Sequence, residues 1–179
     1  MSWRSTGRSI GESVGVIRSY EDRDREACRV LYRALTQWHR DLYADQSISA
    51  GRDPGNFFDE PLATVGADRI WVAEDDGVIL GFVGLIVEDA KGELEPIVVS
   101  PEARGSGIGR ALGEQVIAAA RELGLRRIDV RPVARNDGAI RFFHELGFDT
   151  LGQLELMIYL QEPKDWPMHA RLADRDFRA

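Results

Sequence analysis

Hydrophobic side chains recur at two different periods along this chain, and the change of period separates helices from strands. Over 24–42 and 108–123 apolar residues return every three or four positions, which predicts two amphipathic helices. A third helix is predicted over 137–146, because Asn136 is a favourable N-cap and Gly147 is a favourable end.

Short runs of apolar and β-branched residues predict strands around these helices. Asp76-Gly77, between two such runs, is a strong hairpin signal. The predicted strands cover 14–18, 70–74, 78–87, 93–99 and 126–131, and one or two more fall within 148–160. Gly and Pro punctuate 44–64, which predicts a loop with a short helix. The order of elements predicts a mixed α/β sheet in a single domain.

Length and composition agree with one globular domain. The chain has 179 residues, of which 44% are hydrophobic and 30% are charged. We expect the domain to cover 14–161, between a flexible N-terminal extension (1–13) and an irregular, charged C-terminal tail (162–179). No apolar run approaches the roughly 20 residues that span a bilayer, and the first residues lack the apolar stretch of a secretory signal.

Net charge and cysteine content limit the classes of binding partner and the cellular compartment that we expect. A formal net charge of -7 argues against binding to nucleic acid or to an anionic membrane. The single cysteine, Cys28, excludes intrachain disulfides, and we expect it to serve packing. A cytoplasmic location is therefore predicted. The three histidines are scattered without ligand spacing, so no metal is expected.

The candidate chemistry lies in a glycine-rich turn between the strand at 93–99 and the helix at 108–123. Gly105, Gly107 and Gly109 fall at the predicted start of this helix. A helix start carries unpaired N–H groups and a positive dipole end, and glycines let a phosphate approach the backbone closely. The turn therefore predicts a phosphate or pyrophosphate site. The alternative is that these glycines only form a tight turn.

Two common phosphate-binding patterns do not fit this turn. A Walker loop that starts at Gly105 would need Lys where Arg110 stands. A dinucleotide fingerprint would need a third glycine at Arg110 or at Leu112. A nucleotide-binding α/β domain is thus the least supported interpretation of the glycine-rich turn.

The segment from Arg104 to Leu112 resembles the coenzyme A motif of GNAT acetyltransferases. The matching pattern is Arg104-x-x-Gly107-x-Gly109, after an apolar strand and before a helix. A second segment, 136–148, is similar to the next helix of that family. The resemblance implies the GNAT acyl-CoA N-acyltransferase fold, with a central, mostly antiparallel sheet of six or seven strands. It also implies flanking helices and a splay between the fourth and fifth strands.

The resemblance implies that acetyl-CoA is the cosubstrate and lies between the strands at 93–99 and 126–131. Pro96 and Pro132 support a gap there, because proline cannot donate to a sheet ladder, although each could simply end a strand. The implied coenzyme-binding residues are Ile97, Val98 and Val99 of the strand, Arg104, Gly105, Ser106, Gly107, Ile108, Gly109 and Arg110 of the turn, and Asn136, Ala139, Phe142 and Phe143 of the later helix.

An amine acceptor must lose a proton, because an alkylamine such as lysine has a pKa of about 10.4. Glu95 and Glu93 are the candidate bases, since residues two apart on a strand face the same side. The alternative is that one or both are solvated carboxylates. Many relatives place a tyrosine where Phe143 stands, as the acid that protonates the thiolate. Here this acid is either dispensable, or its place is taken by water, Tyr159 or His144.

The acceptor site is expected on the first long helix and the loop after it. Aromatic residues and acids gather there, which suits an organic cation; the candidates are Trp38, His39, Tyr43 and Phe57. The predicted function is an acetyl-CoA-dependent N-acetyltransferase that acts on a small-molecule or peptide amine, and a homodimer is left open. The alternative is a catalytically silent acyl-CoA-binding module.

Overall fold

The computed structural model describes residues 15–158, 160, 168–172 and 175–178, and within them five strands form one mixed sheet. Its strands, in spatial order, are β1 (Val16–Ser19), β2 (Ile70–Asp75), β3 (Val78–Glu88), β4 (Lys91–Val99) and β5 (Arg127–Asp129). The first four strands pair antiparallel, whereas β5 runs parallel to β4. The α/β architecture with a mostly antiparallel sheet is confirmed.

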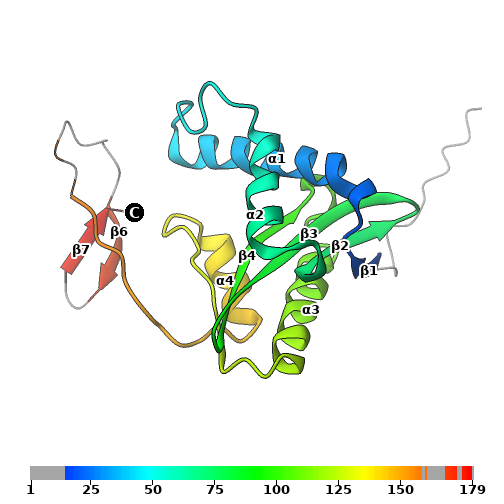
Figure 1. Cartoon of the computed structure of the whole chain (residues 1–179). Coiled ribbons are helices and arrows are strands. Elements are labelled where there is room, and N and C mark those ends of the chain that lie inside the picture. Colours follow the sequence, from blue (N-terminus) through cyan, green and yellow to red (C-terminus); the bar gives the residue numbers. More distant parts are fainter. Residues whose placement is uncertain (1–14, 159, 161–167, 173–174, 179) are drawn as a thin grey trace, which may run out of the picture.

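Helices cover both faces of the sheet (Figure 1). They are α1 (Arg25–Tyr43), α2 (Asp59–Val65), α3 (Ile108–Glu122) and α4 (Asp137–Glu145). One hydrophobic core joins α1 and α2 to the sheet around Phe58 and Phe82, both fully buried. A second core joins α3 and α4 to the opposite face around Leu112 and Phe143. Burial of such side chains is the main stabilising term of the fold.

Local signals in the sequence account for most of these boundaries. Asp76 and Gly77 have φ values of 47° and 79°, the left-handed pair that a tight hairpin needs. Asn136 caps α4, where its side-chain oxygen accepts a hydrogen bond of 2.9 Å from the Ala139 amide. Both signals were predicted from the sequence.

A β-bulge interrupts the pairing of β3 with β4. Val83 pairs with Ile97 and Leu85 with Leu94, so two residues of β4 oppose the single residue Gly84. The carbonyl oxygen of Glu95 comes so close to Gly84 that a Cβ there would lie 2.7 Å from it. Glycine at this position therefore allows the bend that places Glu95.

The structure corrects three predictions about the second half of the chain. Residues 148–158 form no strand, and the sheet of the described residues has five strands rather than six or seven. β5 is shorter than the predicted strand at 126–131. The tail expected to be irregular holds an antiparallel pair, β6 (Met168–Leu172) and β7 (Arg175–Arg178). The predicted extension at 1–13 lies outside the described residues.

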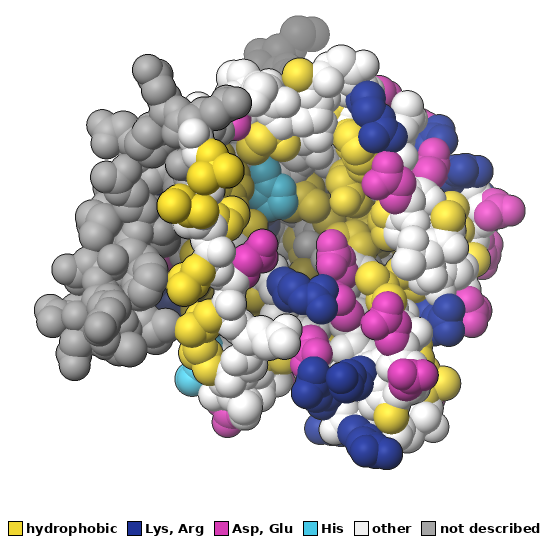
Figure 2. Space-filling view, turned by 60° about the vertical axis from the view of Figure 1, so that its left-hand side comes forward, with side chains coloured by type: hydrophobic (Ala, Val, Ile, Leu, Met, Phe, Trp, Pro, Cys, Tyr) yellow, Lys and Arg dark blue, Asp and Glu magenta, His cyan; other side chains and the backbone are white. Residues whose placement is uncertain are grey.

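The segment 151–158 is rich in apolar residues, but no strand of the described residues pairs with it. Apolar pattern predicts burial only where a partner surface is in reach, and none covers this segment in the structure described. Its large apolar residues are mostly exposed, at 72% for Leu151, 58% for Leu154, 71% for Leu156, 68% for Met157 and 83% for Ile158. Figure 2 shows a column of hydrophobic side chains beside the grey residues on this side of the molecule.

Candidate active site

The glycine turn between β4 and α3 has the geometry of an anion cradle. Gly105 and Gly107 have φ values of 80° and 90°, a region that favours glycine. The first helical hydrogen bond runs from the Ala111 amide to the Gly107 carbonyl at 3.0 Å. The amides of 108–110 therefore point from the helix start without intrahelical acceptors. A Cβ on Gly105 would meet nothing within 4 Å, so the turn is open to a ligand.

The turn, the end of β4 and α4 meet at one point. A Cβ on Gly109 would lie 3.4 Å from the Phe142 ring and 3.7 Å from a methyl group of Val99. Ser106 closes the turn, since its hydroxyl donates to the Ala103 carbonyl at 2.6 Å. The structure thus brings together the three segments that the sequence analysis assigned to coenzyme binding.

β4 leaves one edge of its backbone open beyond the bulge. β4 and β5 pair only at Lys91–Arg127, Gly92–Ile128 and Glu93–Asp129, and no further pair follows in the described residues. On the other side, β4 stays paired with β3 as far as Val99. Residues 97–99 therefore carry backbone groups toward β5 with no strand opposite them.

Two carboxyl groups and an arginine lie where the β4–β5 ladder ends. The Arg131 guanidinium pairs with the Glu93 carboxylate, whose side chain is 16% exposed. Glu95, two residues further along β4, is exposed as a residue, although the protein shields part of its carboxyl group from solvent. Partial burial and the neighbouring Glu93 carboxylate raise the pKa of Glu95, and the positive charge of Arg131 opposes them. A carboxylate with a raised pKa is a better proton acceptor than an ordinary one.

Tyr32 is a site residue that sequence reasoning missed. It lies half-buried on α1 and stacks on Phe82 with ring centroids 6.5 Å apart. Burial, and then the charges of Glu95 and Glu60, raise the pKa of its phenol. The apolar repeat over 24–42 predicted the helix without singling out Tyr32. Nothing in the local sequence indicated that β4 would bring Glu95 near it.

The predicted acceptor residues do not form one cluster. Trp38 faces the turn, with the Arg104 guanidinium 5.8 Å from its ring centroid. His39 packs beside Trp38, and burial lowers the pKa of its imidazole. Tyr43 lies against Arg135, whereas Phe57 lies under Arg52 at 4.4 Å. The C-terminal half of α1 therefore approaches the glycine turn, and Phe57 belongs to the loop after it.

The structure places Phe143 and His144, two of the residues considered around protonation of the coenzyme thiolate, in different environments. Phe143 is only 8% exposed and packs in the core against Phe148, so it contributes packing. His144 is exposed on α4, and Tyr159 lies outside the described residues. Burial raises the pKa of Cys28 to about 12, which agrees with a packing role.

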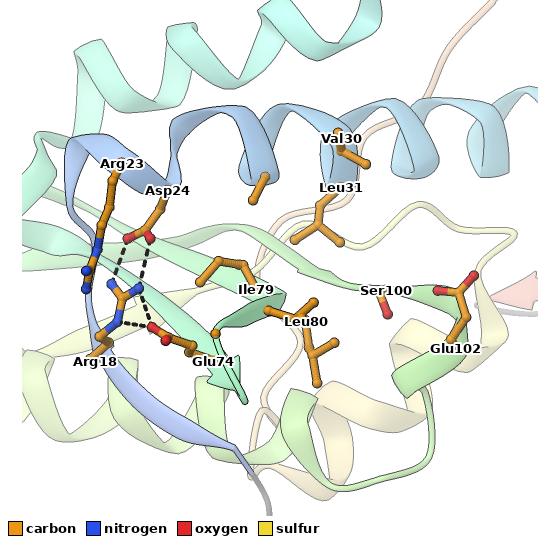
Figure 3. Close-up of a pocket in the computed structure, with 13 residues that line it drawn as sticks. Arg18, Arg23, Asp24, Val30, Leu31, Glu74, Ile79, Leu80, Ser100 and Glu102 are labelled. Carbon is orange, nitrogen blue, oxygen red and sulfur yellow. Dashed lines mark hydrogen bonds and ion pairs between the residues drawn. The ribbon is translucent and has the colours of Figure 1, made fainter.

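A separate groove of about 820 Å³ lies between α1 and the start of β3 (Figure 3). At one end Arg18 pairs with Asp24 at 2.7 Å and with Glu74, and the walls are mainly apolar. At the other end Ser100 and Glu102 lead toward the glycine turn. The groove contains none of the residues predicted for catalysis, so it lies apart from the candidate chemistry.

In the part of the chain that the structure describes, no group of three or more His, Cys, Asp or Glu side chains is placed to hold a metal ion. No helix of those described residues is long and apolar enough to cross a bilayer.

Comparison with known proteins agrees with this geometry. The sequence profile of the acetyltransferase (GNAT) family matches residues 31–148. An amino-acid acetyltransferase of Aeromonas salmonicida is 30% identical over 110 residues, which are 60% of this chain and 24% of that protein. A mycothiol acetyltransferase of Rhodococcus jostii is 30% identical over 151 residues, 76% of this chain and 45% of that protein. This chain thus spans less than half the length of either relative.

The fold also resembles that of solved GNAT-family structures. A GNAT-family acetyltransferase from Staphylococcus aureus superposes with a TM-score of 0.62 at 19% identity, over 87% of this chain and 94% of the other. The residues matched by the profile include the glycine turn, the helix α4, and Glu93 and Glu95 of β4. The chain therefore belongs to the GNAT acetyltransferase family.

Proposed function

We propose that the protein is an acetyl-CoA-dependent N-acetyltransferase that moves the acetyl group directly to a primary amine in a ternary complex. Family membership supports the activity, and the observation that carries it is the meeting of an open glycine turn with an open strand edge. A catalytically silent acyl-CoA-binding module is the second candidate. The absence of a hydroxyl at Phe143 favours it, whereas the raised pKa of Glu95 favours catalysis.

In this proposal the coenzyme follows the edge of β4. Its pyrophosphate accepts hydrogen bonds from the backbone amides of 104–110, and its pantetheine arm pairs with the backbone of 97–99. Asn136, Ala139 and Phe142 of α4 line the opposite side. The open space at Gly105 and the meeting of Gly109 with Phe142 and Val99 fit such a ligand.

Glu95 acts as the base. The amine nitrogen attacks the acetyl carbonyl carbon, a C–N bond forms, and Glu95 takes the amine proton directly or through water. A backbone amide of 97–99 stabilises the oxyanion. The C–S bond then breaks and the coenzyme leaves as a thiolate. With a thiol pKa of about 8.5, this thiolate is a tolerable leaving group and takes a proton from water, while Glu95 returns the amine proton to the solvent, so the protons balance.

The acceptor is proposed to be a small-molecule or peptide amine that enters between the C-terminal half of α1 and β4. Trp38 and His39 lie on that helix, and the charge of Glu95 acts on the phenol of Tyr32 on the same helix. Aromatic faces and carboxylates together suit an organic cation. No metal takes part in the proposed reaction.

Two measurements on the purified chain test the function. Calorimetry with CoA and acetyl-CoA should show binding, and thiol release should rise with one or more amines from a panel of amino acids, polyamines, aminoglycosides and peptides. Binding without turnover on any amine would support the silent module. A chain that binds neither CoA nor its thioester would refute both candidates.

We also propose that the catalytic domain covers 14–161 and that the protein forms a homodimer in the cytoplasm. The buried single cysteine supports a reducing compartment. The open edge of β5 and the exposed apolar segment 151–158 support the dimer, because each copy offers the same two unpaired features to the other.

A further inference from the structure

The register of β4 and β5 places Arg131 opposite the proposed base. The last pair of the parallel ladder is Glu93 with Asp129. Two residues further along the chain stand Glu95, still on β4, and Arg131, two residues beyond the end of β5. Arg131 thus occupies the β5 side of the gap at the level of Glu95.

The side chain of Arg131 reaches across the gap and pairs with Glu93 of β4. Its guanidinium binds the carboxylate of Glu93 and remains 70% exposed, whereas the Glu93 side chain is 16% exposed. Asp129, the nearest carboxylate on β5, is engaged by Arg127 at 3.0 Å on the same strand. The Arg131–Glu93 pair is therefore a connection between the strands just before the coenzyme gap opens.

We infer that Arg131 is a positioning residue, which holds Glu93 across the gap and so sets the charge environment of the base Glu95. The inference rests on the proposed function of Glu95. An unpaired Glu93 carboxylate would stand beside Glu95 and disfavour its ionised form. Paired with Arg131, Glu93 keeps a fixed position and its charge is compensated.

The charged and titratable groups that act on or near Glu95 come from β4, from the residues just after β5, and from α1 and α2. Glu93 of β4 raises the pKa of Glu95, after the effect of partial burial, and Arg131, two residues beyond β5, lowers it. The charges of Glu95 and of Glu60 on α2 both act on the phenol of Tyr32 on α1. Arg131 is thus the cation that offsets Glu93 at the base.

Opposite shifts of the pH profile test the inference. The Arg131→Met variant removes the cation, so the acid limb of kcat/KM should move to higher pH. The Glu93→Gln variant removes the competing carboxylate and frees Arg131, so the same limb should move to lower pH. Arg131→Lys keeps the charge and should restore most of the wild-type profile. These midpoints report the free enzyme.

Arg127→Met is the matched control, because Arg127 is an exposed arginine of β5 that pairs within this strand. Its profile should stay at the wild-type midpoint. A purely structural role of Arg131 would lower the rate in all variants without moving any midpoint, and that result would overturn the inference.

A titration followed by NMR of glutamate carboxyl carbons gives a readout without turnover. The Glu95 resonance, assigned through Glu95→Gln, should titrate at higher pH in Arg131→Met than in the wild type. An unchanged midpoint would overturn the inference even if the enzyme is active. Failure of the wild type to acetylate any amine would instead overturn the proposed function, which separates the two.

Discussion

The chemical properties of single side chains in this site depend on groups that are distant in the sequence. Glu95 stands on a bulge whose bend depends on the missing Cβ of Gly84, since the Glu95 carbonyl occupies that space. Partial burial and Glu93 then raise its pKa. The sequence predicted both glutamates as candidates, because their spacing on one strand is local. It could not predict Arg131 or Tyr32, because each reaches the site from an element far away in the chain.

At this scale we predict that Glu95→Gln lowers kcat by about 100-fold or more, the usual contribution of a general base. Glutamine keeps the size of the side chain but cannot take a proton, so the rise of the rate with pH through the Glu95 pKa should vanish. Coenzyme affinity, measured by calorimetry, should stay near normal. Glu88→Gln, on the exposed end of β3, is the control. An unchanged rate would remove Glu95 from the mechanism.

Among the elements, those with strong local signals were predictable and those that depend on partners were not. The cap at Asn136 and the turn at Asp76 and Gly77 define their boundaries through contacts within a few residues. β5 ends early because its length depends on pairing with β4, which a sequence pattern does not contain. For the same reason the one or two strands predicted within 148–160 do not form over the described residues 148–158.

The turn before α3 gives the prediction for an element. Gly107→Val should weaken coenzyme binding at least tenfold, because its φ of 90° strains a β-branched residue and its side chain fills the cradle. Gly124→Val is the control: φ is 69° at the far end of α3, so the strain of about 1–2 kcal/mol is similar but the cradle is intact. Equal losses of coenzyme affinity in both variants would contradict the placement of the pyrophosphate.

Helices cover both faces of the sheet in the described part of the chain (Figure 1), whereas β5 is one of its edge strands and large apolar residues of 151–158 are exposed. Figure 2 shows hydrophobic side chains gathered on one side of the molecule. Monomeric proteins rarely expose contiguous apolar surface of this kind. Association of two copies would cover it.

Light scattering should therefore give a mass near twice the 20.0 kDa of the chain. Replacing Leu154, Leu156 and Ile158 together by Gln should return the mass to that of one chain, while Leu123→Gln, on the exposed end of α3, should leave the dimer intact. A wild-type mass of one chain at every concentration would contradict the proposal.

The contact between Trp38 and Arg104 couples an indole chromophore to the proposed phosphate cradle. When a diphosphate draws the guanidinium toward the turn, the electric field at the indole changes, and its emission should shift in colour or intensity. Titration with CoA would then read out occupancy optically, without any acceptor. Trp38→Phe, which keeps the other three tryptophans, should abolish the signal while calorimetry still detects the ligand.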